Sequence, residues 1–245
     1  MKYKIISIIP ARYNSKRLFG KLLIEVNNKS ILQHTYECVK KSSLIEKIFI
    51  ATDSELIKKD CQKYNAECLI TSSLPINGTE RIIEALEKYE NILNSQLIVN
   101  VQADHPLIDF NTIDKTILAL LEDDSINVST AVTEVDFETA KKENVVKCVL
   151  DNNNNALYFS RSLIPFSKNI EDEKFFYHIG IYCYRTEFLK KLKYFKNTKN
   201  QMKEDLEQLK ILDNGFKIKA ARVNAIPQGV DVLEDLKKVE EILCR

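Results

Sequence analysis

Residues 8–21 read IIPARYNSKRLFGK, and the rest of the chain is interpreted around this stretch. It continues an apolar run over residues 5–9, which predicts a buried strand. We expect Pro10 to end that strand, because proline has no N–H to give to a sheet ladder. The residues that follow include no acid and several bases: Arg12, Lys16, Arg17 and Lys21. A basic loop at the carboxyl end of the first strand is where an open α/β sheet binds an anion.

Phosphate is the expected anion, because Arg offers a bidentate fork and Lys a mobile point charge. Taken alone, the same stretch also fits a solvated basic turn. Neither common phosphate-loop motif is present: the chain has five glycines, and none falls at the spacing of G-x-x-x-x-G-K-[ST] or G-x-G-x-x-G. Kinase and dinucleotide-dehydrogenase functions are therefore not favoured.

The overall composition narrows the class of protein. Lys plus Arg is 36 and Asp plus Glu is 35, a net charge of +1 that gives no support for a nucleic-acid or membrane-surface partner. No apolar run approaches the roughly 20 residues that span a bilayer. The N-terminal apolar run is too short for a signal peptide, so we expect a cytoplasmic protein.

Cysteine and histidine do not form a recognisable metal motif. None of the six cysteines forms C-x-x-C, and none has a histidine at ligand spacing. In a cytoplasmic protein they are expected to be small buried apolar residues. The three histidines are too scattered in the sequence to suggest a zinc site.

The first half alternates strand and helix, and the second half contains closely spaced strands. In the first half we predict strands at 5–9, 45–51, 67–71 and 96–101, and helices at 30–41, 54–64, 79–90 and 111–121. In the second half we predict strands at 127–135, 145–151, 156–160, 175–185 and 216–223, and helices at 187–194, 203–212 and 232–243. Ser30 and Ser54 are expected helix caps. The pattern predicts an α/β fold, an open, mostly parallel sheet with helices on both faces plus a small antiparallel insertion. We expect one domain over residues 1–245, with the insertion at about 160–185.

Two acids stand where strands or loops end, Asp104 and Asp231. If they converge opposite the basic loop, they make a Mg²⁺ site for a nucleoside triphosphate, because Mg²⁺ prefers carboxylate and phosphate oxygens. The alternative is that Asp104 caps the turn before Pro106 and Asp231 caps the last helix.

A family resemblance rests on motifs that run in order along nearly the whole chain. They are IIPARYNSKRLFGK, IFIATD, GTERI, IVNVQADHPLI, ALYFSRSLIP, HIGIYCYR, EDLEQLKIL and GVDVLEDL. In these the chain resembles the 3-deoxy-manno-octulosonate (Kdo) cytidylyltransferase family. The ALYFSR-x-x-IP run and the LEQL helix are not general features of nucleotide-binding folds.

The resemblance implies a nucleotide-diphospho-sugar-transferase, Rossmann-like fold, a homodimer and dependence on Mg²⁺. It implies that CTP and Kdo give CMP-Kdo and pyrophosphate for lipopolysaccharide biosynthesis. The mechanism we expect is in-line attack of the anomeric hydroxyl on the α-phosphorus of CTP. The nucleotide positions it implies are Ala11, Arg12, Arg17, Lys21, Thr79 and Arg81. The sugar-acid positions are Gln102, Arg161, His178, Tyr182, Glu207 and Gln208, and the metal positions are Asp104 and Asp231. Arg12, Lys21, Asp104 and Asp231 are the expected catalytic residues.

The sugar positions also suit their task chemically. Arg161 is a reasonable partner for the Kdo carboxylate, and the other side chains offer mixed donors and acceptors for hydroxyls. The alternatives remain that Tyr182 is core, that His178 is a satisfied buried imidazole, and that Glu207 and Gln208 are solvated helix positions.

The chain departs from the family pattern in two motifs. L-P-G-K-P is here Leu18-Phe19-Gly20-Lys21-Leu22, which should loosen the phosphate loop. Q-G-D-E-P is here Gln102-Ala103-Asp104-His105-Pro106. Ala103 matters if the position needs positive φ, and His105 removes an acid beside the metal. A related sugar acid, such as 8-amino-Kdo or a capsular sugar, is therefore an alternative substrate. A non-catalytic nucleotide- or sugar-binding relative is a second alternative, which retention of Lys21 and both acids disfavours.

Overall fold

The computed structural model describes residues 3–15, 17–90, 94–168, 174–224 and 229–244. The chain forms two compact units: Met1–Asp114 with Pro227–Arg245, and Lys115–Ile226. Each unit carries its own part of the predicted α/β architecture, and each is described separately. The expectation of one domain with an insertion at about 160–185 stays a prediction.

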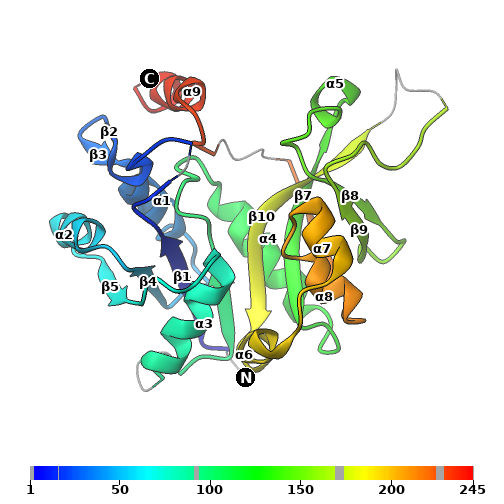
Figure 1. Ribbon diagram of the computed structural model, residues 1–245, viewed down its shortest axis with the longest axis horizontal. Helices are drawn as coiled ribbons and strands as arrows, with labels where there is room; N and C mark the ends of the chain where they lie inside the picture. The colour runs from blue at the N-terminus through cyan, green and yellow to red at the C-terminus, as the bar shows by residue number, and fades with distance from the viewer. Residues whose placement is uncertain (1–2, 16, 91–93, 169–173, 225–228, 245) are drawn as a thin grey trace. The chain divides into compact units, whose positions relative to one another are not determined.

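The first unit is built on parallel strands in the order β6-β1-β4-β5. These are β1 (Ile5–Ala11), β4 (Lys47–Thr52), β5 (Glu67–Ile70) and β6 (Leu97–Asn100). Every residue of β1 is buried, which is the pattern of a strand covered on both faces. Helices α1 (Ile31–Val39), α2 (Glu55–Lys63) and α3 (Gly78–Lys88) pack against these strands, as Figure 1 shows. The predicted β-α alternation of the first half is confirmed.

The prediction that Pro10 ends the first strand is wrong. β1 runs through Pro10 to Ala11, and Pro10 pairs with Ala51 of β4. On its other side, β1 pairs with β6 only from Ile5 to Ile8. Beyond Ile8 that side of the strand has no ladder with β6, so a missing N–H at Pro10 costs no sheet hydrogen bond there.

Helix starts in the first unit follow the local sequence. The Ser30 side chain accepts from Gln33 N, and the Ser54 side chain accepts from Ile57 N, as the capping prediction requires. Before α1, a short 3₁₀ helix η1 (Lys21–Leu23) leads into the hairpin of β2 (Glu25–Val26) and β3 (Lys29–Ser30). Asn27 and Asn28 form its turn with φ of 51° and 61°. Helix α4 (Phe110–Leu121) then carries the chain into the second unit.

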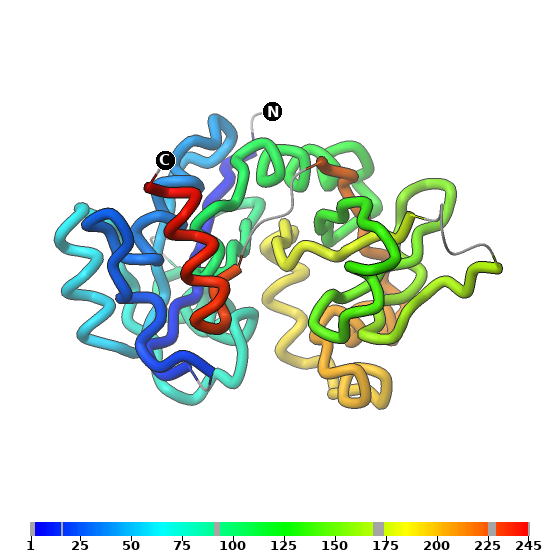
Figure 2. The backbone as a smooth tube through the Cα atoms, turned by 90° about the horizontal axis from the view of Figure 1, so that it is seen from above, coloured from blue at the N-terminus to red at the C-terminus, as the bar shows by residue number. Residues whose placement is uncertain are grey.

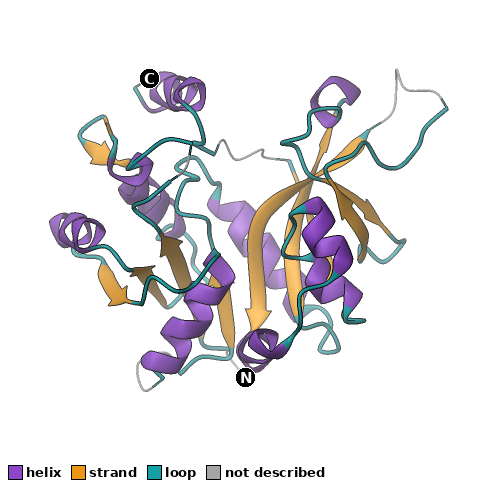
Figure 3. Ribbon diagram, viewed as in Figure 1, coloured by secondary structure: helices purple, strands orange, loops and turns teal. Residues whose placement is uncertain are grey.

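The second unit is mainly antiparallel. β10 (Phe175–Arg185) pairs antiparallel with β7 (Val128–Val135) and with β8 (Lys147–Leu150), and β8 pairs antiparallel with β9 (Ala156–Ser160). β11 (Ile218–Val223) adds to β7 in parallel. Figure 3 shows β10 as the long strand of this unit. Antiparallel pairing in this unit therefore extends over β7–β10.

Two short helices stand where one helix was predicted at 203–212. They are α7 (Lys199–Glu204) and α8 (Leu209–Asp213), separated by Asp205 in the left-handed conformation at φ 53°. Asp tolerates that conformation better than most residues, so Asp205 ends α7 there. The single-helix prediction is wrong because the apolar pattern of the sequence continues past Asp205, whereas the left-handed conformation of that residue interrupts the helix. The unit also contains α5 (Phe137–Ala140), α6 (Thr186–Lys191) and η2 (Leu192–Tyr194).

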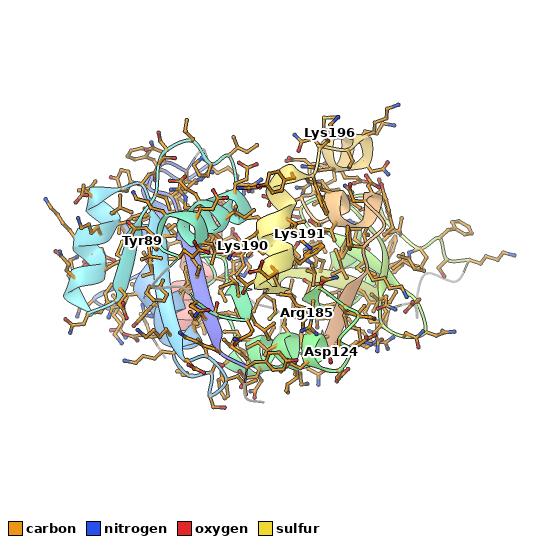
Figure 4. The ribbon with its side chains drawn as sticks, turned by 90° about the horizontal axis from the view of Figure 1, so that it is seen from below. Tyr89, Asp124, Arg185, Lys190, Lys191 and Lys196 are labelled. Atoms are coloured by element: carbon orange, nitrogen blue, oxygen red, sulfur yellow. The ribbon has the colours of Figure 1, made fainter. Side chains whose placement is uncertain are left out.

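Polar contacts anchor the end of β10. Arg185 donates through Nη2 to Asp124 Oδ1 at 2.9 Å and through Nε to Ile126 O at 2.8 Å. Figure 4 labels Arg185 and Asp124 together with Lys190, Lys191 and Lys196, which lie in α6 and beyond. The guanidinium thus holds the loop before β7 against the last residue of β10.

The chain ends in the first unit. Helix α9 (Leu233–Leu243) is drawn in red in Figure 2 and belongs to the unit that carries β1. The backbone just before it is tied to the loop after β6, because Val230 N donates to Asp104 O at 2.9 Å. This return of the chain brings the side-chain carboxylate of Asp231 to the basic loop that contains Arg17 and Lys21.

The cysteine prediction is partly right. Cys61, Cys148 and Cys183 are buried, Cys38 and Cys68 are half-buried, and all of these are free thiols. Cys244 is exposed, because it follows the outer end of α9. No helix in the described part of the chain is long and apolar enough to cross a bilayer.

Candidate active site

The centre of the candidate site is the ammonium group of Lys21. It donates to Asp104 Oδ2 at 2.5 Å, to Asp231 Oδ1 at 2.9 Å and to Val230 O at 2.8 Å. Its side chain is only 11% exposed. Gly20 precedes it at φ 65°, a conformation that glycine adopts without strain, and this turn directs the chain into η1. All three donors of one buried lysine therefore bind acceptors from two distant parts of the chain.

The two acids are held by different elements of the same unit. Asp104 lies in the loop after β6, and Asp231 lies just before α9. Arg17 also donates to Asp231 Oδ1, at 2.8 Å, in an exposed ion pair. The tertiary structure thus places both predicted carboxylates on one cation, with a second cation beside them.

The geometry does not support the helix-cap alternative for Asp231. The N–H groups of Asp231 and Val232 donate to the Asp235 carboxylate, at 3.1 and 3.2 Å. Asp235 therefore caps α9, and the Asp231 carboxylate is left for Lys21 and Arg17. The Asp104 carboxylate is likewise bound to Lys21 and does not cap the turn before Pro106.

The charges stabilise one another despite burial. For Lys21, burial alone would lower the pKa, but the carboxylates of Asp104 and Asp231 outweigh it and raise the pKa above the ordinary lysine value. For Asp104, burial alone would raise the pKa, but the electrostatic interactions with His105 and Lys21 and the hydrogen bond from Lys21 outweigh it and hold the pKa below the ordinary aspartate value. Lys21 and Asp104 therefore each stabilise the charged form of the other.

The carboxylates suit a hard divalent cation. Asp104 and Asp231 present oxygen ligands around one positive charge, and Mg²⁺ is commonly bound by one or two carboxylates together with substrate phosphates. The described residues contain no group of three or more His, Cys, Asp or Glu side chains that could hold a metal by themselves. Two carboxylates alone would leave most coordination positions of a Mg²⁺ ion to other oxygen ligands.

The predicted nucleotide residues surround the end of β1. Ala11 is the last residue of β1 and fully buried, and Arg12 is half-buried and donates through Nη2 to Pro75 O. Thr79 lies in the first turn of α3, after the Asn77 cap, and is half-buried. The basic loop therefore contacts the segment that leads into α3. The order of the motifs in the sequence did not predict this contact.

Arg81 differs from an open nucleotide contact. Its side chain is 1% exposed, donates to Thr71 Oγ1 at 2.5 Å and to Ser72 O at 3.1 Å, and lies 3.4 Å from Asp53 Oδ1. Burial lowers the pKa of this guanidinium, and Asp53 partly offsets the effect. Asp53 was not predicted as a site residue. Its position directly after strand β4, at the same edge of the sheet as the other candidate residues, could have indicated it. The buried Arg81 guanidinium therefore fixes the loop before α3 through its hydrogen bonds to Thr71 and Ser72.

In the second unit, two predicted sugar residues lie on β10 beside a register shift. β10 pairs regularly with β7 up to Ile179, and pairing resumes at Tyr182. His178 and Tyr182 are 6% and 7% exposed, and their ring centroids are 5.5 Å apart. Burial lowers the pKa of His178 to about 3, so the imidazole is neutral, and burial raises the pKa of Tyr182, so its hydroxyl keeps its proton.

The other sugar residues of this unit have different environments. Gln208 is buried, with Nε2 3.5 Å from His178 Nδ1, and Glu207 is exposed. Arg161 donates through Nε to Glu204 O at 2.9 Å and through Nη2 to Asp205 O at 3.3 Å. The Arg161 side chain is 40% exposed and caps the end of α7. Gln102 lies in the first unit and is half-buried. Its backbone carbonyl accepts a hydrogen bond from the His105 N–H at 3.3 Å.

The departures from the family pattern are accommodated locally. Ala103 is not among the positive-φ residues, so its methyl is tolerated, and its carbonyl accepts from Thr35 Oγ1 at 2.9 Å. His105 Nε2 lies 3.8 Å from Asp104 Oδ1. Leu22 is buried, while Phe19 is 67% exposed and packs edge-on to Tyr13 at 5.1 Å.

Comparison with known proteins gives one consistent family. Residues 6–218 match the family described as cytidylyltransferase. A 3-deoxy-manno-octulosonate cytidylyltransferase of Protochlamydia amoebophila (strain UWE25) is 42% identical, over 100% of this chain and 96% of that protein. The mitochondrial 3-deoxy-manno-octulosonate cytidylyltransferase of Arabidopsis thaliana is 40% identical, over 98% of this chain and 83% of that protein.

A solved structure gives the same result for the fold. The structure of a CMP:2-keto-3-deoxy-manno-octonic acid synthetase complexed with CTP matches with a TM-score of 0.93 and 30% identity. The match covers 98% of both chains. The predicted fold class is therefore confirmed over nearly the whole chain.

Proposed function

The chain belongs to the cytidylyltransferase family, and from that premise we propose that it transfers CMP from CTP to the anomeric hydroxyl of Kdo. The products are CMP-Kdo and pyrophosphate. The reaction makes the protein a nucleotidyltransferase, and its proposed place is lipopolysaccharide biosynthesis. The names of the relatives support the choice of substrates. The cluster of Lys21, Asp104 and Asp231 supports the transfer reaction.

The observation that carries the proposal is the convergence of Asp104 and Asp231 on Lys21. Burying charged groups carries a desolvation cost even when they are paired. A protein that only binds its ligand has no need to keep two acids around a nearly buried lysine. Phosphoryl transfer does need such groups, since its catalysis consists mainly of positioning and of offsetting charge on phosphate oxygens. Retention of all three groups in contact favours the enzyme over the binding alternative.

The basic residues have distinct tasks in this proposal. Arg12 and Arg17 offer planar forks for phosphate oxygens, and Lys21 offers a point charge. Lys21 exchanges carboxylate partners for phosphate oxygens when the nucleotide binds, because its three donors are already committed to protein acceptors. These cations offset negative charge as the bond to the α-phosphorus forms and pyrophosphate leaves.

Asp104 and Asp231 are the residues that would hold Mg²⁺. Bound there together with phosphate oxygens, the ion would supply Lewis-acid charge stabilisation for the transferring and leaving phosphates. Ala11, Thr79 and Arg81 are proposed to shape the nucleotide side of the site from β1 and α3.

Gln102, Arg161, His178, Tyr182, Glu207 and Gln208 are the proposed sugar-acid residues. Tyr182 keeps its hydroxyl proton, so it can donate to a sugar oxygen. Arg161 has a partly exposed guanidinium that can also bind a carboxylate, although backbone carbonyls already accept from it. Its test is Arg161→Met, which should raise the KM for the sugar acid and leave the KM for CTP unchanged.

We further propose a homodimer in the cytoplasm, where CTP is available. Among the described strands, β9 pairs only with β8 and so leaves one edge open. Large apolar side chains on and after β9 are exposed: Leu157 at 59%, Leu163 at 36% and Phe166 at 87%. An open edge with apolar neighbours is a surface that a second copy can cover. Light scattering on Phe166→Glu should show a shift from dimer to monomer.

The decisive test is a panel of sugar acids with CTP and Mg²⁺, read by pyrophosphate release and product mass. Kdo should give the highest kcat/KM. A clear preference for 8-amino-Kdo or a capsular sugar acid would replace the substrate, and His105 beside Asp104 would be the first position to examine. Binding of CTP without any product would favour the non-catalytic alternative.

A further inference from the structure

Thr130 of β7 is a fully buried residue that no sequence motif singled out. Its hydroxyl oxygen has three neighbours at hydrogen-bond distance. They are Ile181 O at 2.7 Å, Ile179 O at 3.2 Å and His178 Nε2 at 2.9 Å. All of these belong to β10, so one side chain links β7 to the strand that carries two predicted sugar residues.

The proton count at Thr130 decides the protonation of His178. A hydroxyl has one hydrogen, and a backbone carbonyl can only accept. The two carbonyl neighbours therefore take the Thr130 hydrogen, and the 2.7 Å contact to Ile181 O is the shorter one. His178 Nε2 must then be the donor to the Thr130 oxygen. The imidazole is neutral, because burial lowers its pKa to about 3, so Nδ1 carries no hydrogen and accepts.

The same reasoning orients the amide of Gln208. The Gln208 side chain approaches His178 Nδ1 at 3.5 Å, and an accepting Nδ1 requires the NH₂ end of the amide. The carbonyl end, Oε1, then points away from the imidazole. This oxygen is therefore the end of the amide that can accept from a ligand.

The backbone explains why a threonine is needed at this point. The pairing of β10 with β7 shifts register between Ile179 and Tyr182, so Gly180 and Ile181 have no paired residue on β7. A bulge of this kind leaves carbonyls outside the ladder and re-aims neighbouring side chains. Thr130 lies opposite the bulge, satisfies its carbonyls, and uses the same oxygen to hold His178.

We propose that Thr130 is a positioning residue that fixes His178 as the Nε2–H tautomer and thereby turns Gln208 Oε1 toward a sugar hydroxyl. The proposal rests on the proposed function for the identity of the ligand. It has a consequence for recognition: Gln208 Oε1 accepts, so it binds a hydroxyl and not the carboxylate of the sugar acid. His178 acts through Gln208, because both of its ring nitrogens are occupied within the protein.

The first test reads the tautomer and needs no substrate. The chain has three histidines, so ¹⁵N-histidine labelling with two-bond ¹H–¹⁵N spectra resolves them, and His178→Asn assigns the signals. The parent should show His178 as Nε2–H. Thr130→Val removes the acceptor and should mix or invert the tautomer of His178, while Thr130→Ser should keep it. A parent spectrum with Nδ1–H at His178 overturns the proposal.

The second test reads the consequence for the sugar. Thr130→Val should raise the KM for the sugar acid about tenfold, the scale of one lost hydrogen bond, with the KM for CTP unchanged. Thr130→Ser should restore the parent value. Thr133→Val is the matched control, since it removes a buried hydroxyl from the same strand that the structure does not bond to His178. An unchanged sugar KM in Thr130→Val, or an equal rise for CTP, overturns the proposal.

A third variant covers the case in which Thr130→Val does not fold. Gln208→Glu replaces the NH₂ donor by an oxygen at almost constant shape, so His178 Nδ1 should gain a proton to face it. An unchanged His178 spectrum in Gln208→Glu overturns the orientation of the amide. If no sugar acid is turned over but Thr130→Val still shifts the tautomer, the proposed function fails and the positioning of His178 by Thr130 stands.

Discussion

Lys21 Nζ lies 2.5 Å from Asp104 Oδ2, and the two residues come from loops that follow different strands of one parallel sheet. With Asp231 and Arg17 the cluster contains two positive and two negative charges. Such a balanced set is stable without a ligand and can exchange partners when a nucleotide and a cation arrive together. These contacts contribute to folding and, in the proposed function, also to the reaction, and single substitutions can separate the two contributions.

Lys21→Met should abolish turnover and also weaken the fold. Losing the ammonium removes the proposed phosphate ligand and leaves Asp104 and Asp231 without the cation that both contact. Removing one partner of a buried ion pair costs about 3–5 kcal/mol, and partial exposure of the acids, 25% and 41%, reduces the expected loss to about 2 kcal/mol. Urea denaturation measures this loss. Lys29→Met, which breaks an exposed pair with Glu37, is the matched control and should change stability little.

Asp104→Asn should lose turnover by about two to four orders of magnitude, the scale of a lost electrostatic catalytic group, while keeping its fold. The amide preserves the shape but removes the charge that a divalent cation and Lys21 both need. Pyrophosphate release at saturating CTP and Mg²⁺ is the measurement. Asp109→Asn, in the same loop, should retain parent activity. An active Asp104→Asn would mean that the cation is held elsewhere.

Gly229→Ala should disturb the site through His105. A Cβ at this position would lie 3.1 Å from His105 Nε2, closer than side chains normally pack. The imidazole must shift, and it lies 3.8 Å from Asp104 Oδ1, so the carboxylate is expected to move with it. Overpacking of this kind costs about 1–3 kcal/mol. The double variant His105→Ser with Gly229→Ala should recover most of the kcat/KM, and no recovery would contradict the proposed contact.

Arg81→Met should act mainly on stability. The guanidinium is almost fully buried against Thr71, Ser72 and Asp53, and its removal leaves Asp53 without its partner. The expected loss is about 3 kcal/mol, the scale for breaking a buried ion pair from one side. Urea denaturation reads the loss, and Arg222→Met, an exposed position, serves as the control. An unchanged midpoint would indicate that Arg81 serves the nucleotide alone.

His178 should make the folded state acid-sensitive. Its pKa is about 3 in the folded protein, against the ordinary histidine value of 6.5 in the unfolded chain, so the unfolded chain takes up the proton first as the pH falls. The stabilising contribution is therefore present above pH 6.5 and is lost progressively below it. Between pH 7 and pH 5 the loss amounts to roughly 2 kcal/mol for one proton. His178→Gln should remove this part of the pH dependence of the unfolding free energy, and equal slopes for parent and variant would contradict it.

The local sequence was informative where short-range chemistry acts. Ser30 and Ser54 cap their helices as predicted, and the strand and helix order of the first half follows from its apolar periodicity. Local patterns failed at Pro10, where the extent of a neighbouring strand decides the cost of a missing N–H. They also failed at Asp205, where one residue with positive φ interrupts a continuous apolar pattern.

For the candidate site, the sequence by itself determined which charges are available: a basic loop, two acids and a set of polar side chains on later elements. Only the tertiary structure decided that Lys21 binds both acids, that Arg81 is buried against Asp53, and that Thr130 holds His178. The physical reason is that hydrogen bonds and ion pairs depend on distances of a few ångströms between residues far apart in the chain. Periodicity and spacing report only on neighbours, whereas the return of α9 and the bulge in β10 arise from packing of the whole unit.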